Sequence, residues 1–270
     1  MLVAVDTGGT KTLVASFLED GRIGKQSRFP TPKDETQYIT ELNQEIISIL
    51  EGATPTAIIV GLPGRISPER ILYHARNLGW KDFDVRKELA KTFDCPILIE
   101  NDANLAGLAE TRQLKTIPPV SLYLTFSTGV GSGIIVDGKI EPHFQQSEAG
   151  QMLIERDGAL RTWESFASGK YVLKAYGKPA SEITSKSAWK QIAKNISSGI
   201  AVISPLLRPD VIIIGGSIGM FFGKYEKYLD DYLAETLKHH YVSKIMKAKH
   251  PELAVIYGCY YYALDSLTTS

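Results

Sequence analysis

The sequence predicts an α/β fold in two lobes that begin alike, and three features of its 270 residues support this prediction. Short apolar segments alternate with helical patterns along the chain, as in proteins that combine strands with helices. Residues 2–17 and 120–136 each contain a buried strand, a turn rich in glycine and in serine or threonine, and a second strand. An Asp-Gly turn follows in both places, at Asp20-Gly21 and Asp137-Gly138. This repetition predicts an internal duplication, and the length suits two lobes.

The first half of the chain is predicted to alternate strands with helices. Residues 2–5 are wholly apolar, so we expect a buried strand there. Residues 34–50 place Ile39, Leu42 and Ile46 at helical spacing, which predicts an amphipathic helix. The other elements predicted in this half are strands at 13–17, 57–60 and 96–99 and helices at 84–93 and 103–113.

Pro118-Pro119 interrupts the pattern, and we predict the boundary between the lobes there. The first lobe is expected at residues 1–117 and the second at 118–255, with the C-terminal helix, about residues 256–270, completing the first lobe. The elements predicted in the second lobe are strands at 120–124, 133–136 and 211–214, a turn at 126–132 and a helix at 189–203.

Composition excludes several classes of function. Thirty basic residues balance thirty acidic ones, so charge gives no reason to expect nucleic acid or a membrane surface as a partner. The two cysteines, Cys95 and Cys259, lie far apart and form no CxxC pair, which argues against a zinc ribbon or a redox motif. The first residues lack the pattern of a signal peptide, and the apolar run 211–214 is too short to span a bilayer. We therefore expect a cytoplasmic protein.

Two turns are candidates to hold the phosphates of a nucleotide. In Asp6-Thr7-Gly8-Gly9-Thr10-Lys11 the paired glycines let backbone N–H groups approach an anion, and Asp6 could hold hydrated Mg²⁺. Ser127-Thr128-Gly129-Val130-Gly131-Ser132-Gly133 offers a second turn of this kind. The first turn lacks the spacing of a P-loop. A hairpin turn with a capping aspartate is the alternative for the first, and a flexible hairpin is the alternative for the second.

Acidic residues and a glycine-rich strand end complete the set of candidates. Asp102 stands where a strand ends and a helix begins, so it could be a helix N-cap or a general base for phosphoryl transfer. Gly215-Gly216-Ser217-Ile218-Gly219 follows a buried strand and could support a nucleoside. Glu148 and Glu164 could bind sugar hydroxyls, and the alternative is a solvated glutamate.

Taken in order, these motifs resemble those of the ROK family of bacterial sugar kinases and repressors, within the actin-like ATPase superfamily. The resemblance covers nearly the whole chain. The matching segments are Asp6–Lys11 and Thr125–Gly138 for the phosphates, Asn77-Leu78-Gly79-Trp80 and Glu100-Asn101-Asp102-Ala103-Asn104 for the sugar, and Pro209–Gly216 for the adenosine.

The resemblance implies a two-lobed actin-like fold with the active site in the cleft between the lobes, and it implies a role for each motif. Asp102 would be the catalytic base, and Asp6 would organise Mg²⁺ through water. A homodimer would be usual. The sugar would be bound by Gly64, Asn77, Asn101, Glu148, Gln151 and Glu164. ATP would be bound by Asp6, Gly8, Gly9, Thr10, Lys11, Thr128, Gly129, Gly131, Gly215 and Gly216.

The sequence departs from the family pattern in the zinc segment and at two serines. Gln151 stands where a zinc-binding histidine is usual, and the following segment, 152–163, contains no cysteine. Ligand and cysteines are missing together, so we predict no zinc site; the amide of Gln151 can still contact a sugar. Ser127 and Ser217 stand where glycine is more usual.

The expected activity is ATP-dependent phosphorylation of a hexose-type sugar. Glucose is the first choice, because Asn77–Trp80 resembles the glucokinase members. N-acetylmannosamine is the second, and fructose, mannose, N-acetylglucosamine and other N-acetylhexosamines stay open, as does polyphosphate in place of ATP. The alternative of another class is a sugar-binding sensor that has lost catalysis. The repressor branch is set aside, because the first phosphate motif begins at Asp6 and leaves no room for a DNA-binding domain before it.

Overall fold

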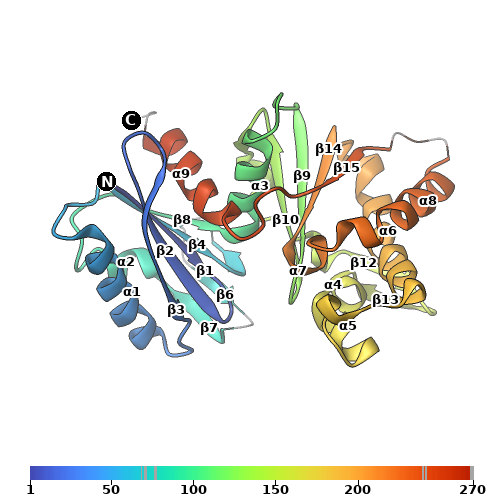
Figure 1. Cartoon of the computed structure of the whole chain (residues 1–270), viewed down its shortest axis with the longest axis horizontal. Coiled ribbons are helices and arrows are strands. Elements are labelled where there is room, and N and C mark those ends of the chain that lie inside the picture. Colours follow the sequence, from blue (N-terminus) through green and yellow to red (C-terminus); the bar gives the residue numbers. More distant parts are fainter. Residues whose placement is uncertain (68, 70–71, 76–77, 239, 241, 268–270) are drawn as a thin grey trace. The chain divides into compact units, whose positions relative to one another are not determined.

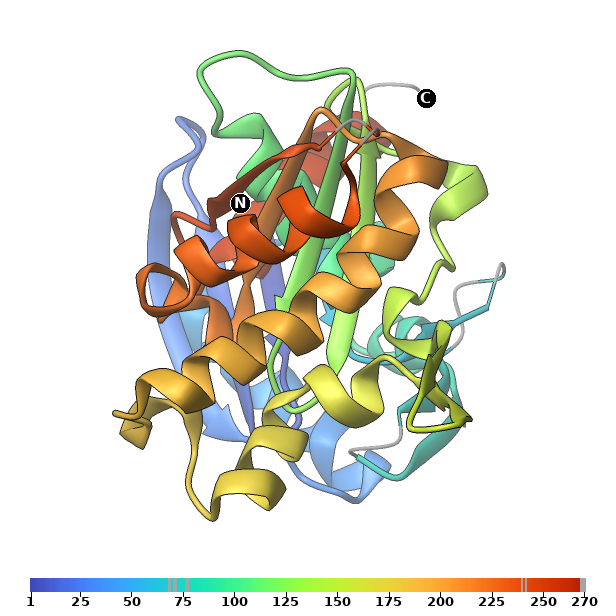
Figure 2. The ribbon, with the colours of Figure 1, turned by 90° about the vertical axis from the view of Figure 1, so that its right-hand side faces the viewer.

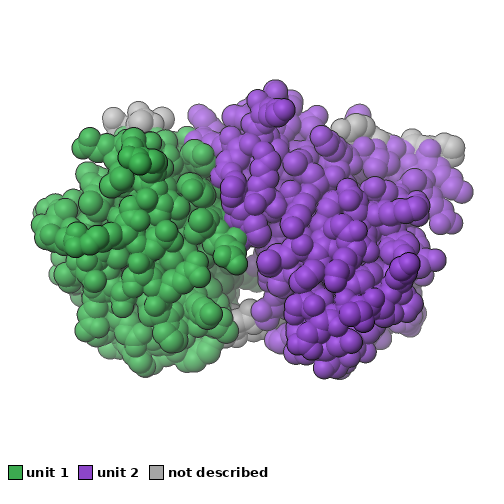
Figure 3. All heavy atoms as spheres, in the orientation of Figure 1, with its two compact units in different colours: residues 1–109, 252–270 green, residues 110–251 purple. Residues whose placement is uncertain are grey.

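The computed structural model describes residues 1–67, 69, 72–75, 78–238, 240 and 242–267. The chain forms two compact units, coloured separately in Figure 3. Unit 1 comprises residues 1–109 and 252–270, and unit 2 comprises residues 110–251. The lobe boundary predicted at residues 117 and 118 stays a prediction. No helix among the described residues is long and apolar enough to cross a membrane.

A five-stranded mixed sheet forms the centre of unit 1. Its strand order is β3-β2-β1-β4-β8, with antiparallel pairs from β3 to β1 and parallel pairs from β1 to β8. The parallel strands β1, β4 and β8 all end at the same edge, where polar residues gather. The strands are β1 (Leu2–Thr7), β2 (Lys11–Phe17), β3 (Ile23–Pro30), β4 (Ala57–Leu62) and β8 (Ile97–Asn101).

Helices cover this sheet, and the first of them does so with one apolar face. Asp34 caps α1 (Glu35–Leu50) by accepting a hydrogen bond from the N–H of Gln37, and the helix buries Tyr38, Leu42 and Ile46 with Val3 and Val5 of β1. The helix α9 (Ala254–Leu267) lies against β1 and β4 (Figure 1). The other helices of this part of the chain are α2 (Val85–Leu89) and α3 (Asp102–Arg112), which begins in unit 1.

The sheet of unit 2 repeats the topology of the first. Its order is β11-β10-β9-β14-β15, again with two antiparallel pairs followed by two parallel pairs. Each sheet thus begins with a three-stranded meander, and its first strand then pairs with a later parallel strand. This agreement supports the internal duplication predicted from the sequence. The strands are β9 (Val120–Phe126), β10 (Val130–Val136), β11 (Lys139–Ile140), β14 (Val211–Gly215) and β15 (Lys244–Lys247).

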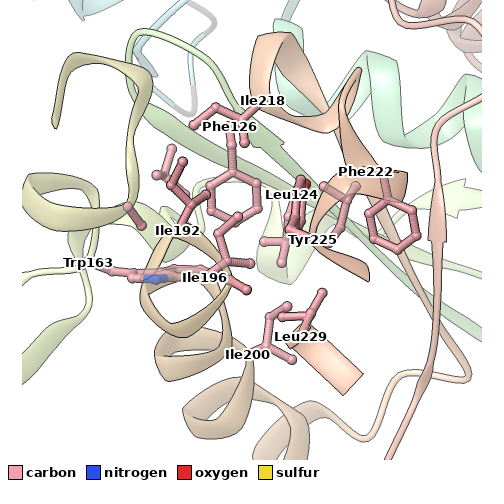
Figure 4. Close-up of a cluster of buried hydrophobic side chains, with 14 of the residues drawn as sticks. Leu124, Phe126, Trp163, Ile192, Ile196, Ile200, Ile218, Phe222, Tyr225 and Leu229 are labelled. Atoms are coloured by element: carbon pink, nitrogen blue, oxygen red, sulfur yellow. The ribbon is translucent and has the colours of Figure 1, made fainter. Parts of the chain in front are cut away.

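The core of unit 2 lies between its sheet and two packed helices, α6 (Lys186–Leu207) and α8 (Glu226–Thr236), which cross in front of the strands in Figure 2. Figure 4 shows Leu124 and Phe126 of β9 with Ile192, Ile196 and Ile200 of α6. Gly199 of α6 lets the indole of Trp163 lie against the helix, because a Cβ there would overlap the ring. The shorter helices are α4 (Glu164–Ala167), α5 (Gly169–Tyr176) and α7 (Gly216–Gly219), with single 3₁₀ turns at Pro142–Phe144, Ala149–Gln151, Ala180–Glu182 and Phe222–Lys224.

Two small sheets lie outside the central ones. In unit 1, β5 (Arg65–Ile66), β6 (Leu72–Ala75) and β7 (Trp80–Phe83) form an antiparallel sheet. In unit 2, β12 (Leu153–Arg156) and β13 (Ala159–Thr162) form a hairpin over the segment where the sequence predicts the loss of a zinc module.

Two elements differ from the sequence prediction. The turn predicted at 126–132 is shorter, because Val130, Gly131 and Ser132 pair with Phe126, Thr125 and Leu124 and extend β10. Gly131 therefore lies in a strand. The helix predicted at 84–93 ends at Leu89 in α2, since the chain continues in turns before β8.

Candidate functional site

The turn between β1 and β2 is closed by a hydrogen bond between its first and last residues, and Thr31 supports it with two further hydrogen bonds. The N–H of Gly8 donates to the carbonyl of Lys11 at 2.9 Å. A Cβ on Gly8 would lie 2.8 Å from the same oxygen, so a larger residue would force the turn open. Thr31 donates from its hydroxyl to the carbonyl of Gly8 at 2.9 Å and from its backbone N–H to the carbonyl of Thr10 at 3.0 Å.

The segment Thr31–Lys33 forms a brace for this turn, and we call it the brace below. The ammonium group of Lys33 donates to the carbonyl of Gly9 at 3.1 Å. The indole N–H of Trp80, a residue 1% exposed, donates to the carbonyl of Lys33 at 2.9 Å. Trp80 belongs to the predicted sugar motif, so the brace joins that motif to the first phosphate turn inside unit 1. The sequence gives no signal for it, since the partners are far apart along the chain.

Asp6 lies at the carboxyl end of β1, in register with Leu13 of β2 and Gly61 of β4. The pKa of Asp6 is raised to about 7, mainly by loss of solvation and also by the charge of Asp102, while the charge of Arg28 acts in the opposite direction. Two carboxylates that oppose each other's ionisation in this way form a site that a cation stabilises. Mg²⁺ prefers one or two carboxylates and retains several waters, so this donor set fits Mg²⁺.

Asp102 is the first residue of α3, directly after β8. Burial raises its pKa to about 6, although a hydrogen bond from the N–H of Ala103 at 2.8 Å works against the shift. The side chain of Asn101 also caps this helix, because its oxygen accepts from the N–H groups of Ala103 and Asn104 at 2.8 and 3.2 Å. Asn101 thus provides part of the N-terminal capping of α3. Capping of this helix therefore does not by itself explain why an aspartate stands at position 102.

Glu100, for which the sequence predicts no individual role, supports this helix start from within the core. Its carboxylate is 1% exposed and accepts from the backbone N–H of Asn101 at 2.8 Å and from the side-chain amide of Asn104 at 3.0 Å. In the sequence, only the position of Glu100 between an apolar strand and Asn101 could have indicated this role. Glu100 therefore fixes the backbone on which Asn101 and Asp102 stand.

Gly64 is held directly beside Asn101. The side-chain amide of Asn101 donates to the carbonyl of Gly64 at 3.0 Å, which leaves one amide hydrogen for a ligand. Gly64 has φ +96, and a Cβ would overlap the carbonyl oxygen of His74, so the position requires glycine. Asn77, the other predicted sugar ligand of this region, lies outside the described residues.

In unit 2, the turn Ser127–Gly129 joins β9 to β10 and is contacted by Glu164. The carboxylate of Glu164 accepts from the N–H of Val130 at 3.0 Å, and a Cβ on Gly129 would overlap the same carboxylate. Thr128 is exposed at the tip of the turn. The structure thus brings a predicted sugar ligand into contact with the predicted phosphate turn.

Glu148 and Gln151 lie on a segment that is fastened to β10. The hydroxyl of Ser132 donates to the carbonyl of Ser147 at 3.2 Å and accepts from the N–H of Ala149 at 3.0 Å. Gly150 packs on the backbone of Val130, where any side chain would overlap the carbonyl oxygen. Glu148 and Gln151 are therefore held beside the strand that follows the phosphate turn, and both are partly exposed.

The glycines after β14 lie against neighbouring backbone and ring atoms. Gly215 faces the hydroxyl of Tyr123, which a Cβ would overlap. Gly216 has φ +78, and its Cβ would lie 2.6 Å from the carbonyl oxygen of Phe126. The start of α7 therefore contacts the end of β9 directly.

The segment after Gln151 contains a hairpin that carries no cysteine or histidine. Within the described part of the chain, no three His, Cys, Asp or Glu side chains gather into a metal-binding group. The prediction that this protein binds no zinc stays a prediction.

Comparisons with known proteins agree with these motifs. A model of the ROK family matches residues 2–266. An N-acetylmannosamine kinase of Vibrio cholerae is 31% identical over 253 residues, 83% of this chain and 86% of that protein. A glucokinase of Streptomyces coelicolor is 24% identical over 262 residues, 81% of this chain and 82% of that protein. The solved structure of a ROK family glucokinase from Streptomyces griseus, in complex with glucose and AMPPNP, has a TM-score of 0.82 at 21% identity, and the match covers 96% of this chain and 97% of that one. This likeness confirms the predicted α/β fold of the actin-like type.

Proposed function

Because this chain belongs to the ROK family, and its named relatives are sugar kinases, we propose that it transfers the terminal phosphoryl group of ATP to a hydroxyl of a hexose-type sugar. The class of enzyme is a carbohydrate kinase, and glucose is the first candidate for its sugar. The observation that carries the proposal is the pair Asp6 and Asp102 at the carboxyl edge of the first sheet, with pKa values of about 7 and about 6. Carboxylates with such pKa values suit proton transfer and cation binding near neutral pH.

Asp102 is proposed as the general base. It accepts the proton of the attacking sugar hydroxyl while the bond between that oxygen and the γ-phosphorus forms. The bond from the γ-phosphorus to the oxygen that bridges it to the β-phosphorus breaks, and ADP leaves with the electron pair. Asn101, fixed by Gly64 and by the N-terminus of α3, would orient the sugar with its remaining amide hydrogen.

Asp6 would hold Mg²⁺ through water, and the ion would neutralise charge on the phosphates of ATP. In unit 1, the backbone of the turn at Gly8, Gly9, Thr10 and Lys11 would contact phosphate oxygens. The brace keeps this turn in place through the carbonyls of Gly8, Gly9 and Thr10, which leaves the turn's N–H groups at Gly9 and Thr10 for an anion.

Unit 2 would supply the second set of phosphate contacts and the nucleoside site. Thr128 and Gly129 form the turn, and Gly131 follows in β10. Gly215 and Gly216 would lie against the nucleoside. Glu148, Gln151 and Glu164 would bind sugar hydroxyls, since carboxylates and amides both bond to hydroxyl groups.

Several finer assignments remain part of the proposal. N-acetylmannosamine is the second candidate sugar, supported by the relative at 31% identity. Fructose and other N-acetylhexosamines are further candidate sugars, and polyphosphate is the alternative phosphoryl donor. We also propose a homodimer, a cytoplasmic location and lobes at residues 1–117 and 118–255, with the helix near 256–270 completing the first.

The test is an assay of ADP release with MgATP against a panel of hexoses and N-acetylhexosamines, with Asp102→Asn as the matched variant. Asparagine can still accept from the N–H of Ala103, so the helix start should survive. Turnover on one sugar should fall about 10²–10⁴-fold in the variant, while sugar binding measured by calorimetry persists. Near-normal turnover in Asp102→Asn would overturn the assignment of the base. Sugar binding without turnover in the native protein would indicate a sensor instead.

A further inference from the structure

Ser127 connects three segments of unit 2, and each of its polar groups serves a different connection. Its N–H donates to the carbonyl of Gly129 at 2.9 Å, within the turn. Its carbonyl accepts from the N–H of Gly169, the first residue of α5, at 2.6 Å. Its hydroxyl oxygen accepts from the N–H of Ser217, in α7, at 3.1 Å.

The third connection depends on the side chain alone. Glycine at this position would keep both backbone bonds and lose the bond to Ser217. Alanine would do the same, so the hydroxyl is a feature of this chain that joins the phosphate turn to the start of α7. The side chain of Ser217 takes no part, because the donor is its backbone N–H.

The surrounding contacts leave little room for these segments to shift. A Cβ on Gly216 would lie 2.6 Å from the carbonyl oxygen of Phe126, the residue before Ser127. A Cβ on Gly169 would lie 2.7 Å from the carbonyl oxygen of Ser127. The phosphate turn, α5 and α7 therefore meet at Ser127 through backbone contacts, and the hydroxyl adds the one side-chain bond between the turn and α7 recorded in this part of the structure.

We propose that Ser127 is a positioning residue of the nucleotide site: its hydroxyl fixes the glycines at 215 and 216 relative to the phosphate turn, so that both can contact one ATP molecule. This inference rests on the proposed function, because it assumes that these two segments bind the nucleoside and the phosphates.

The test compares MgADP affinity, measured by calorimetry without sugar, among the native protein, Ser127→Ala, Ser127→Gly and Ser127→Thr. Loss of one hydrogen bond should weaken MgADP binding by about two- to tenfold in the alanine and glycine variants. Threonine retains a hydroxyl and should restore the native affinity. The KM for ATP should rise by a similar factor, while the KM for the sugar stays within about twofold of the native value.

Ser198→Ala is the matched control, because the hydroxyl of Ser198 donates within its own helix, to the carbonyl of Lys194 at 2.9 Å. It should leave MgADP affinity unchanged. Native affinity in Ser127→Ala, or failure of threonine to restore binding that alanine has lost, would overturn the inference and leave the kinase proposal standing. A folded native protein that does not bind MgADP would overturn both.

Discussion

The carboxylate of Glu164 accepts a hydrogen bond from the backbone N–H of Val130, with 3.0 Å between Oε2 and the nitrogen. Val130 is the first residue of β10 after the phosphate turn, and Glu164 is the first residue of α4. The side chain proposed to bind a sugar hydroxyl thus also supports the turn proposed to bind phosphate. Because both residues belong to unit 2, one side chain connects the proposed sugar site with the proposed phosphate site within a single compact unit.

Glu164→Gln and Glu164→Ala should separate these two roles. Glutamine keeps an oxygen for the N–H of Val130 but loses the charge, so the KM for the sugar should rise about tenfold while the KM for ATP stays within about twofold of the native value. Alanine removes both contacts, so both KM values should rise. Steady-state kinetics with each substrate varied in turn will measure this. Equal KM values for ATP in the two variants would contradict a role of Glu164 in the turn.

The pH dependence of turnover should report the ionisation of Asp102. A general base must be ionised, and the pKa of Asp102 is raised to about 6, so kcat/KM for the sugar should fall as pH decreases through about 6. The fall should approach tenfold per pH unit on the acid side. ADP should be quantified directly, so that coupling enzymes do not limit the profile. A rate that stays constant down to pH 4.5 would exclude a base with this pKa.

Asp6→Asn should stabilise the free protein at high pH. The pKa of Asp6 is about 7 in the folded protein and 3.8 for an unperturbed aspartate, so the folded state holds a proton that the unfolded state releases. The resulting cost to stability is absent below pH 3.8, grows as pH rises and is complete above about pH 7. Asparagine removes this cost, roughly 4 kcal/mol for a rise of about three pKa units at about 1.4 kcal/mol each, together with the activity.

Thermal unfolding of Asp6→Asn at pH 8 and pH 4.5, without Mg²⁺ or nucleotide, will measure this effect. The gain in Tm over the native protein should be larger at pH 8. Asp137→Asn is the control, since Asp137 is exposed in a turn with φ 48, which asparagine also adopts. An equal gain at both pH values would show that desolvation of the charge is not its cause.

Much of the architecture could be predicted from sequence because its signals are local. Apolar runs located β1, β4 and β14, and helical spacing located α1 and the centre of α6. The same local patterns placed the glycine turns and Asp102 at strand ends. The predicted length of the second turn was wrong. Its serine and glycine residues are typical of a turn, but residues 130–132 pair with residues 124–126, and this pairing depends on the sheet and not on the local sequence.

Contacts between distant segments could not be predicted in this way. The bonds from Trp80 to Lys33 and from Val130 to Glu164 join residues 47 and 34 positions apart, and no periodicity or turn preference encodes such pairs. The brace is the main example, since nothing in the sequence marks Thr31 as a support of the phosphate turn.

Thr31→Val should test the brace. Valine preserves the shape of Thr31 but removes the hydroxyl, which donates to the carbonyl of Gly8 and bonds to the hydroxyl of Thr12, each at 2.9 Å. We expect a loss of about 1–2 kcal/mol in stability and weaker MgADP binding, because Thr31 is 7% exposed and its partners lose a buried contact. Thr40→Val is the control, since the hydroxyl of Thr40 donates to the carbonyl of Thr36 within α1. Native MgADP affinity in Thr31→Val would show that the brace is not needed for nucleotide binding.

The hairpin of β12 and β13 is held by an arginine in the segment where the resemblance places zinc. Arg156 lies over the ring of Phe166, with 4.6 Å from its guanidinium carbon to the ring centre, and donates to the side chain of Asn195 at 2.8 Å. Asn195, 2% exposed, also donates to the carbonyl of Phe166 at 2.7 Å. Arg156 thereby fastens the hairpin to α4, which carries Glu164, and to α6.

Stability should therefore depend on Arg156 and not on a metal. Arg156→Gln should lose about 1–3 kcal/mol, because it removes the cation–π contact and weakens the bond to Asn195. Arg161→Gln is the control, since Arg161 is exposed on the same hairpin. Treatment of the native protein with a zinc chelator should leave its Tm unchanged, and elemental analysis should find no stoichiometric zinc. A chelator that lowers the Tm would mean that ligands other than the family's histidine and cysteines bind zinc. Arg156 would then stabilise the hairpin together with a metal ion, and not in its place.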